Sequence, residues 1–410
     1  MKKAIFLLLF ALSFITAKAD YPKIPFRTGL WTGTLTLNDS VELPFTFDLG
    51  FPVLKLVIHD NGEEIEAQDF RFTQDSIFWH MPVFDSYFLC KREQDTCFSG
   101  VFVNNAASHP YRIPFRAYFG TRTRPIIPRK DPVDLSGKWQ CQFSPGTADS
   151  SNAIGIFHTP YNGGTMTGTF LTETGDYRYL GGEFRGWMDF SISTFDGSHA
   201  FVFKGEKQPD GTIKGEVWYG NYGYEKWIAK RNDNYQLRDP LHLTYVTDSS
   251  KVGFTFTDLN GKSVSLSDPQ FKGKVVIVQI MGSWCPNCMD ETAEMSALYK
   301  KYHSQGLEII ALAYERSADT AIANTNIRRV KKQFNADYTF LNTGLKGAKA
   351  ASASLPFVNG IMCFPTSIYI GRDGKVKEIF TGYNGPATGD AYKRDKADTE
   401  HLIEVLLSKK

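Results

Sequence analysis

One stretch decides the fold of the last third of this chain: Val275-Val276-Ile277-Val278-Gln279-Ile280-Met281-Gly282-Ser283-Trp284-Cys285-Pro286-Asn287-Cys288-Met289-Asp290-Glu291. The continuous apolar run, rich in β-branched residues, predicts a buried parallel strand. Gly282 and Ser283 end the run, and Pro286 suits the first position of a helix, where a missing N–H costs nothing. Apolar and aromatic residues then recur at helical spacing as far as Tyr302. The stretch therefore predicts a strand, a turn, a Cys-x-x-Cys pair and a helix.

The predicted geometry favours thiol chemistry at Cys285. A helix N-terminus presents unpaired N–H groups and the positive end of the helix dipole, and both stabilise an anion. The thiolate is the reactive form of cysteine. Cys288 follows one helical turn later, close enough to displace a group that Cys285 has captured. Together the two thiols are the minimum needed for thiol–disulfide exchange.

Further motifs carry a resemblance to a known family. Trp284-Cys285-Pro286-Asn287-Cys288 follows the hydrophobic strand, Phe364-Pro365-Thr366 comes about eighty residues later, and Gly371-Arg372-Asp373-Gly374-Lys375-Val376 lies just beyond. With these motifs, residues 251–410 resemble the thioredoxin-fold domain of the TlpA/ResA-like family of extracytoplasmic thiol–disulfide oxidoreductases. The whole-chain layout also resembles Bacteroidetes members of this family that carry a long β-rich N-terminal region.

The resemblance implies roles for particular residues. Pro365 matches the family's cis-proline that faces the two cysteines, and cis peptides are nearly confined to proline. Glu291 matches the family's active-site glutamate. The predicted catalytic residues are thus Cys285, Cys288, Glu291 and Pro365. The groove that receives an extended substrate segment is predicted to be lined by Trp284, Pro286, Asn287, Phe364 and Thr366.

A disulfide exchange at this site needs a proton acceptor for Cys288. Glu291 could serve if it is buried and its pKa is raised. The alternative is that Glu291, as we expect for Asp290, is an exposed first-turn carboxylate that only complements the helix dipole. Gln279 occupies the position where thioredoxin has a buried acid and cannot titrate, which shifts any proton relay toward Glu291. No cofactor beyond the Cys285–Cys288 pair is expected.

The start of the chain predicts export. Residues 1–19 combine Lys2 and Lys3 at the start, a short apolar core and the small-x-small site Ala17-Lys18-Ala19, which is typical of a cleaved signal peptide. The alternative, a membrane anchor, is disfavoured because the apolar core is too short to span a bilayer comfortably. Removing three lysines with the signal changes the formal charge from +2 to −1, so nothing favours nucleic-acid binding. A periplasmic or otherwise exported protein without a stable membrane span is expected.

Residues before 250 predict all-β structure in two similar units, so the expected fold is multidomain, with barrel-like or meander units before the α/β domain. Short alternating runs, frequent turn signals and many aromatic residues fill the region. Trp31 recurs as Trp139, and Phe84-Asp85-Ser86 recurs as Phe195-Asp196-Gly197, at offsets of 108 and 111 residues. Coincidence in aromatic-rich sequence is the alternative. The predicted boundaries are 22–124 and 132–232 for the units, 233–250 for a linker and 251–410 for the C-terminal domain.

The other four cysteines show no metal-binding pattern, because a structural zinc site needs four ligands, usually with a second close pair. No metal is therefore expected. Cys90 and Cys97 bracket a predicted hairpin, and a disulfide between them is favoured over two free thiols. Cys141 is expected to be buried and inert. Cys363 is either a small buried residue, which we favour, or a third thiol near the site.

Two other functions remain alternatives. Peroxiredoxins share the thioredoxin fold, but their peroxidatic cysteine usually follows a Thr-x-x-Cys pattern, and here Gly282 stands three residues before Cys285. A thiol peroxidase is therefore disfavoured. The β-rich region could instead be a ligand-binding or partner-binding module, with the C-terminal domain as a scaffold. The favoured partners are protein thiols or disulfides and an upstream electron donor.

Overall fold

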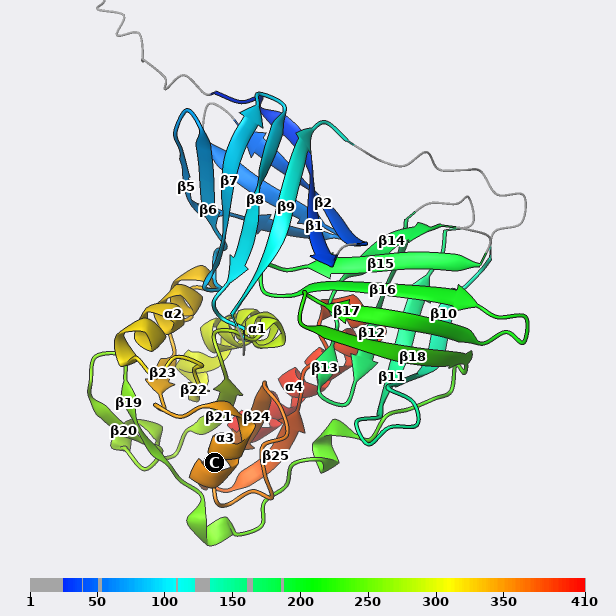
Figure 1. Cartoon of the computed structure of the whole chain (residues 1–410). Coiled ribbons are helices and arrows are strands. Elements are labelled where there is room, and N and C mark those ends of the chain that lie inside the picture. The colour runs from blue at the N-terminus through cyan, green and yellow to red at the C-terminus, as the bar shows by residue number, and fades with distance from the viewer. Residues whose placement is uncertain are drawn as a thin grey trace, which may run out of the picture.

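The computed structural model describes residues 25–38, 40–50, 54–107, 110–121, 133–160, 165–185 and 188–409. The predicted signal peptide at 1–19 and residues 122–132, which connect the two β-rich units in the sequence, lie outside these ranges. Three bodies follow one another along the chain, and α1 faces the two β-rich bodies (Figure 1). Among the helices described, none combines the length and the hydropathy needed to cross a bilayer.

The first unit is an antiparallel meander that begins at Gly29, and its last strand pairs with its first. Its sheet order is β4-β3-β2-β1-β9-β8-β7-β6-β5, so the first and last strands are neighbours. Alternate residues face inward and form an aromatic core that includes Trp31, Phe47, Trp79 and Phe88. The strands are β1 Gly29–Asn38, β2 Val41–Gly50, β3 Lys55–Asp60, β4 Glu63–Glu66, β5 Gln68–Phe72, β6 Ser76–His80, β7 Ser86–Gln94, β8 Cys97–Asn104 and β9 Tyr111–Phe119.

The second unit is a closed antiparallel barrel. Its order is β11-β10-β18-β17-β16-β15-β14-β12-β13, and β11 also pairs with β12, which closes the ring. Closure removes the exposed edges of a sheet. The strands are β10 Gly137–Phe143, β11 Ser151–His158, β12 Met166–Thr172, β13 Gly175–Asp176, β14 Leu180–Phe184, β15 Asp189–Phe195, β16 Ala200–Lys207, β17 Ile213–Tyr219 and β18 Gly223–Arg231.

The two units begin in the same way, as the sequence repeat predicts. Each unit opens with a glycine in the left-handed region, at φ +116° for Gly29 and +113° for Gly137, a conformation that favours glycine. The tryptophan two residues later donates its indole N–H to a carbonyl four residues earlier. The distances are 3.1 Å for Trp31 and 2.8 Å for Trp139. Equivalent residues therefore make equivalent contacts 108 residues apart.

The predicted Cys90–Cys97 disulfide is wrong. The β7–β8 hairpin turns at residues 95–96, so Cys97 lies opposite Gln94 while Cys90 lies opposite Gly100. Cys90 is a free thiol in the core of the unit, and Cys97 donates to the Glu93 carboxylate at 3.4 Å. The spacing of the two cysteines alone could not place this turn. Cys141, as predicted, is fully buried.

Replacing Cys97 with serine is therefore expected to have a small effect. A serine hydroxyl retains the hydrogen bond to Glu93, so the free energy of unfolding should change by less than about 1 kcal/mol. Loss of a structural disulfide would instead cost about 2–5 kcal/mol. Denaturant unfolding of the variant and the parent distinguishes the two cases, and a loss above about 2 kcal/mol would contradict the register described above.

The C-terminal domain has a seven-stranded mixed sheet in the order β20-β19-β23-β22-β21-β24-β25. The three central strands, β23, β22 and β21, are parallel, and the outer strands pair antiparallel. The strands are β19 Thr255–Asp258, β20 Ser263–Ser265, β21 Val275–Met281, β22 Leu307–Ala313, β23 Thr339–Asn342, β24 Thr366–Ile370 and β25 Val376–Thr381. The helices are α1 Pro286–Tyr302, α2 Thr320–Gln333, α3 Gly347–Ser354 and α4 Asp390–Ser408.

β21 is buried on both faces, as its apolar run predicts. Val275, Ile277 and Met281 belong to a core shared with α1, α2 and α4. Val276 and Val278 belong to a second core that includes residues of α3. Because side chains alternate across a strand, these two cores lie on opposite faces of the sheet. Packing on both faces fixes the position of the end of β21, and the Cys-x-x-Cys pair follows shortly after it.

The two repeated Phe-Asp loops both reach the C-terminal domain. Phe84, in the first unit, packs into the core that contains α1. Ser198, just after the equivalent loop of the second unit (called the second barrel below), donates to the Trp284 carbonyl at 3.4 Å. The loops also touch each other, since Ser86 Oγ donates to the Gly197 carbonyl at 2.5 Å. The duplication thus places equivalent loops of both units against one part of the C-terminal domain.

Candidate active site

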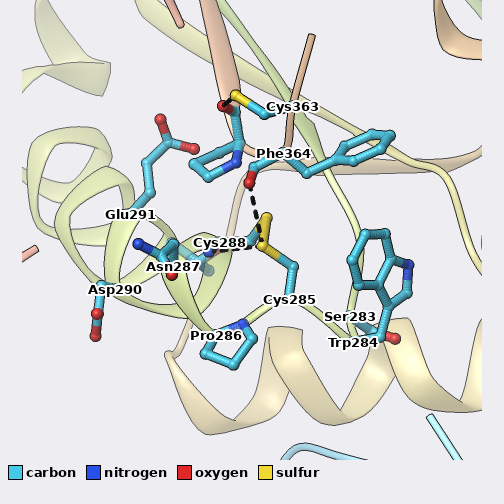
Figure 2. The surroundings of a disulfide bond; sticks show 12 residues. Ser283, Trp284, Cys285, Pro286, Asn287, Cys288, Asp290, Glu291, Cys363 and Phe364 are labelled. Atoms are coloured by element: carbon cyan, nitrogen blue, oxygen red, sulfur yellow. Dashed lines mark hydrogen bonds between the residues drawn. A yellow bond between two sulfur atoms is a disulfide. The ribbon is translucent and has the colours of Figure 1, made fainter. Parts of the chain in front are cut away.

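The two cysteines of the motif lie at the start of α1 and are joined in a disulfide, with Cα atoms 5.2 Å apart (Figure 2). Cys285 is the N-cap, and its sulfur accepts the backbone N–H of Cys288 at 3.2 Å. The turn before it is tight, because a Cβ on Gly282 would lie 2.3 Å from the Trp284 indole nitrogen. Cys288 is fully buried, whereas Cys285 keeps 6% of its surface exposed. Cys285 is thus the more accessible of the two sulfurs.

The Phe364-Pro365 loop lies across from this disulfide. The peptide bond between the two residues is cis, as the resemblance implies. The Phe364 carbonyl oxygen is 3.5 Å from the Cys285 sulfur (Figure 2). Thr366, predicted to line a substrate groove, is fully buried instead, and its hydroxyl donates to the Cys363 carbonyl. It therefore supports the loop from within and does not face a substrate.

Trp284 covers another side of the disulfide and is held by three contacts. Its indole N–H donates to the Tyr314 carbonyl at 3.0 Å, and its ring meets the Phe364 ring edge-on at 5.4 Å. The Arg316 guanidinium lies 3.9 Å from the centre of the same ring, close enough for a cation–π interaction. The indole is therefore fixed in orientation.

Glu291 is a buried carboxylate one turn beyond Cys288. Its oxygens accept hydrogen bonds from the Gln279 amide at 2.9 Å and the Ser367 hydroxyl at 2.8 Å. The Tyr338 hydroxyl donates to the Gln279 carbonyl oxygen and so orients that amide. Burial raises the pKa of Glu291 to about 7, although the two hydrogen bonds oppose the shift. A carboxyl group with this pKa can hold or release a proton near neutral pH.

Asp290 differs from the sequence expectation of an exposed first-turn carboxylate. Its side chain is only 18% exposed, and it forms a 2.7 Å ion pair with Arg178 of the second barrel. Burial raises the pKa of Asp290 to about 7, while Arg178 acts in the opposite direction. No local pattern near the cysteines indicates this partner, because it comes from 112 residues earlier in the chain.

The two residues between the cysteines are also covered by the second barrel. Asn287 donates to the Asp176 carboxylate at 3.1 Å, and the Pro286 carbonyl accepts from Arg178 at 3.1 Å. Asp176 and Arg178 were not predicted as part of the site. The repeat pattern could have pointed toward this surface, since it marked Asp196, which also contacts Arg178.

Cys363 lies in the loop next to the site and is partly buried. Its thiol contacts the Pro365 carbonyl at 3.6 Å. Burial raises the pKa of this thiol to about 12, which keeps it protonated at neutral pH. Among the residues that the structure describes, no cluster of histidine, cysteine or acidic side chains is arranged to hold a metal ion.

The fold and the site define a thioredoxin-like domain that carries a Cys-x-x-Cys disulfide opposite a cis-proline. The Redoxin family model matches residues 246–399. Thiol-disulfide oxidoreductase ResA of Bacillus thuringiensis subsp. konkukian is 37% identical over 149 residues, which cover 35% of this chain and 78% of that protein. ResA of Bacillus subtilis is 31% identical over 135 residues, which cover 33% and 66%.

The chain therefore belongs to the TlpA/ResA-like family of thiol-disulfide oxidoreductases, and it is an enzyme of that class. A solved thiol:disulfide interchange protein from Chlorobium tepidum is 22% identical, with a TM-score of 0.30, and the match covers 38% of this chain and 94% of that one. The family match lies within the C-terminal part of the chain and does not include the two β-rich units.

Proposed function

We propose that this enzyme exchanges disulfides with partner proteins through Cys285. The observation that carries the proposal is the Cys285–Cys288 disulfide at the first turn of α1, beside the Phe364 carbonyl and the cis-proline. The helix N-terminus stabilises a Cys285 thiolate. Cys288, being fully buried, is reachable only through Cys285.

The exchange has two steps when the pair begins reduced. The Cys285 thiolate attacks one sulfur of the partner disulfide, a mixed disulfide forms, and the other partner sulfur leaves as a thiolate that takes up a proton. Cys288 then loses its proton and attacks the Cys285 sulfur. The mixed disulfide breaks, and the second partner sulfur leaves and is protonated. Two electrons pass to the partner, and the reverse direction uses the same intermediate.

Glu291 is proposed as the proton acceptor for Cys288. It lies on the same helix one turn away, and burial brings its pKa to about 7, between those of an ordinary carboxylate and an ordinary thiol. Gln279 and Ser367 hold the carboxylate in place. Because Gln279 cannot titrate, Glu291 is the group on this face of the sheet best suited to the task.

Pro365 and the backbone of Phe364 are proposed to present one wall of the substrate site. Trp284 forms a second wall of the substrate site, and Pro286 and Asn287 form the base of the site. An extended segment of the partner would pair with the backbone next to Pro365, as peptides add to the edges of sheets. The chemistry balances with the two cysteines and the partner alone, so we propose that no further cofactor takes part.

We further propose that the protein is exported, that residues 1–19 are cleaved off, and that an upstream electron donor reduces the cysteine pair. In an oxidising compartment such as the periplasm, a Cys-x-x-Cys pair is more often redox-active than metal-binding. A donor is required because every turn that reduces a partner leaves the pair oxidised. N-terminal sequencing of the mature protein tests the cleavage, and cell fractionation tests the compartment.

Trapping tests the exchange itself. In Cys288→Ser the second step is blocked, so a mixed disulfide through Cys285 is expected to accumulate, and mass spectrometry would identify the partner. The control is Cys288→Ser combined with Cys363→Ser, which should trap equally well. Absence of any trapped partner, or trapping that is lost in the control, would contradict the assignment of Cys285 as the nucleophile.

The thiol peroxidase and binding-module alternatives each have a direct test. Fast consumption of hydrogen peroxide by the reduced protein would favour the peroxidase. If Cys285→Ser left every activity and cellular phenotype unchanged, the β-rich region would be the functional module.

A further inference from the structure

The second barrel places one short segment directly on the active-site surface. Residues 174–178 include the turn after β12 and the strand β13, and they lie on the side of the barrel that faces the C-terminal domain (Figure 1). Their neighbours include Asn287, only 9% exposed, and Pro286, which is buried. Residues 174–178 therefore cover the two residues between the cysteines.

The segment contacts the Cys-x-x-Cys motif closely. Asn287 donates to both the backbone carbonyl and the carboxylate of Asp176, at 3.2 and 3.1 Å. Gly175, at φ +135°, is packed so tightly that a Cβ there would lie 2.8 Å from the Asn287 amide nitrogen. Only glycine allows both this backbone conformation and this approach.

The same segment also contacts the loop after β25. The Gly385 N–H donates to the Asp176 carboxylate at 2.8 Å. A Cβ on Gly382 would lie 2.9 Å from the Thr174 carbonyl carbon. Gly382 in turn donates its N–H to the Pro365 carbonyl at 2.9 Å, which ties this loop to the cis-proline. Residues 174–178 therefore lie between the motif and the loop bonded to the cis-proline.

Arg178 stabilises the packing of residues 174–178 against the C-terminal domain. Its guanidinium is 6% exposed and contacts one carboxylate from each of the three bodies, namely Glu63, Asp196 and Asp290. The same group donates to the Pro286 carbonyl. A buried charge is tolerated only when it is paired, so separation of the barrel from α1 must expose or re-pair these groups. The packing of the second barrel against α1 is thus stabilised by specific contacts.

We propose that residues 174–178 determine substrate specificity by occupying the position that the polypeptide of a protein substrate needs beside Cys285. The inference rests on the proposed exchange function. A disulfide within a folded partner carries chain on both sides and must displace the segment, whereas a small disulfide needs room only for its own substituents. The rate with a protein disulfide is therefore reduced by the fraction of molecules in which the segment is docked.

The test compares two disulfides with the full-length mature enzyme. One is insulin, and the other is bis(2-hydroxyethyl) disulfide, with dithiothreitol supplying two electrons and two protons for each disulfide reduced. In Gly175→Leu the new side chain collides with Asn287 and undocks the segment. The ratio of the insulin rate to the small-disulfide rate should rise by about tenfold, the factor expected if the docked state predominates. Arg178→Met should raise the same ratio by an independent route.

Gly211→Leu is the matched control. Gly211 is another glycine of the same barrel with positive φ, at +84°, and a Cβ added there would meet no described atom within 4 Å, so the ratio should not change. An unchanged or lowered ratio in both Gly175→Leu and Arg178→Met, with both disulfides still reduced, overturns the specificity proposal alone. Failure of the parent enzyme to reduce either disulfide overturns the exchange function on which it rests.

Discussion

Replacing Cys285 with serine is expected to abolish disulfide exchange, lowering the rate by roughly a thousandfold or more, as loss of a catalytic nucleophile does in other enzymes. A serine hydroxyl at the helix N-terminus is not ionised at neutral pH, and Cys288 is fully buried and cannot replace the lost nucleophile. Insulin reduction under dithiothreitol, corrected for the uncatalysed rate, is the measurement.

Cys97→Ser is the matched control, because it removes a thiol of the first unit that is remote in sequence from the motif. Its activity should equal that of the parent. Residual exchange above about a tenth of the parent rate in Cys285→Ser would show that another thiol carries the reaction, and Cys363, in the loop beside the site, would be the first to test.

Glu291→Gln is expected to remove a pH dependence of stability. Burial raises the pKa of Glu291 from 4.5 to about 7, so between these values the folded enzyme holds a proton that the unfolded chain has released. The parent's stability therefore falls as pH rises from about 4.5 to about 7, and it changes little from this source above that range. A neutral glutamine avoids this loss. The free energy of unfolding of the variant should therefore exceed that of the parent by about 3 kcal/mol at about pH 8, and the two should be equal at about pH 4.

The same variant should be a poorer enzyme. Without a carboxylate to accept the Cys288 proton, the second step should slow by roughly a hundredfold, the usual contribution of a general base. Stopped-flow measurement of mixed-disulfide decay gives this rate, and denaturant unfolding across the pH range gives the stability. Glu206→Gln, which alters an exposed carboxylate of β16, should change neither. Equal pH profiles for Glu291→Gln and the parent would contradict the buried, raised-pKa carboxyl described above.

The local sequence determined the central elements of the C-terminal domain. An unbroken apolar run encodes a strand buried on both faces, and β21 is buried at every position. Pro286 and Cys285 encode the start of a helix, and α1 begins there. These signals depend on neighbouring residues alone, and for that reason they can be interpreted without knowledge of the fold. The recurrence of Gly-x-Trp likewise revealed two similar units, because each copy repeats its own local contacts.

Register and burial depended on partners distant in the chain. The hairpin spacing of Cys90 and Cys97 suggested a disulfide, but the turn at residues 95–96 pairs Cys97 with Gln94 and leaves Cys90 opposite Gly100. Thr366 belongs to a recognisable motif, yet β24 buries its side chain completely. In each case the residue type was compatible with several environments, and the pairing of strands selected one of them.

By itself, then, the sequence determined a thioredoxin-like domain with a Cys-x-x-Cys pair at a helix start, because those features arise from residues adjacent in the chain. Only the tertiary structure decided what surrounds the pair. Asp176 and Arg178 contact Asn287, Pro286 and Asp290 across more than a hundred residues of chain. Such contacts depend on how the three bodies pack, and no periodicity or spacing near the cysteines encodes that packing.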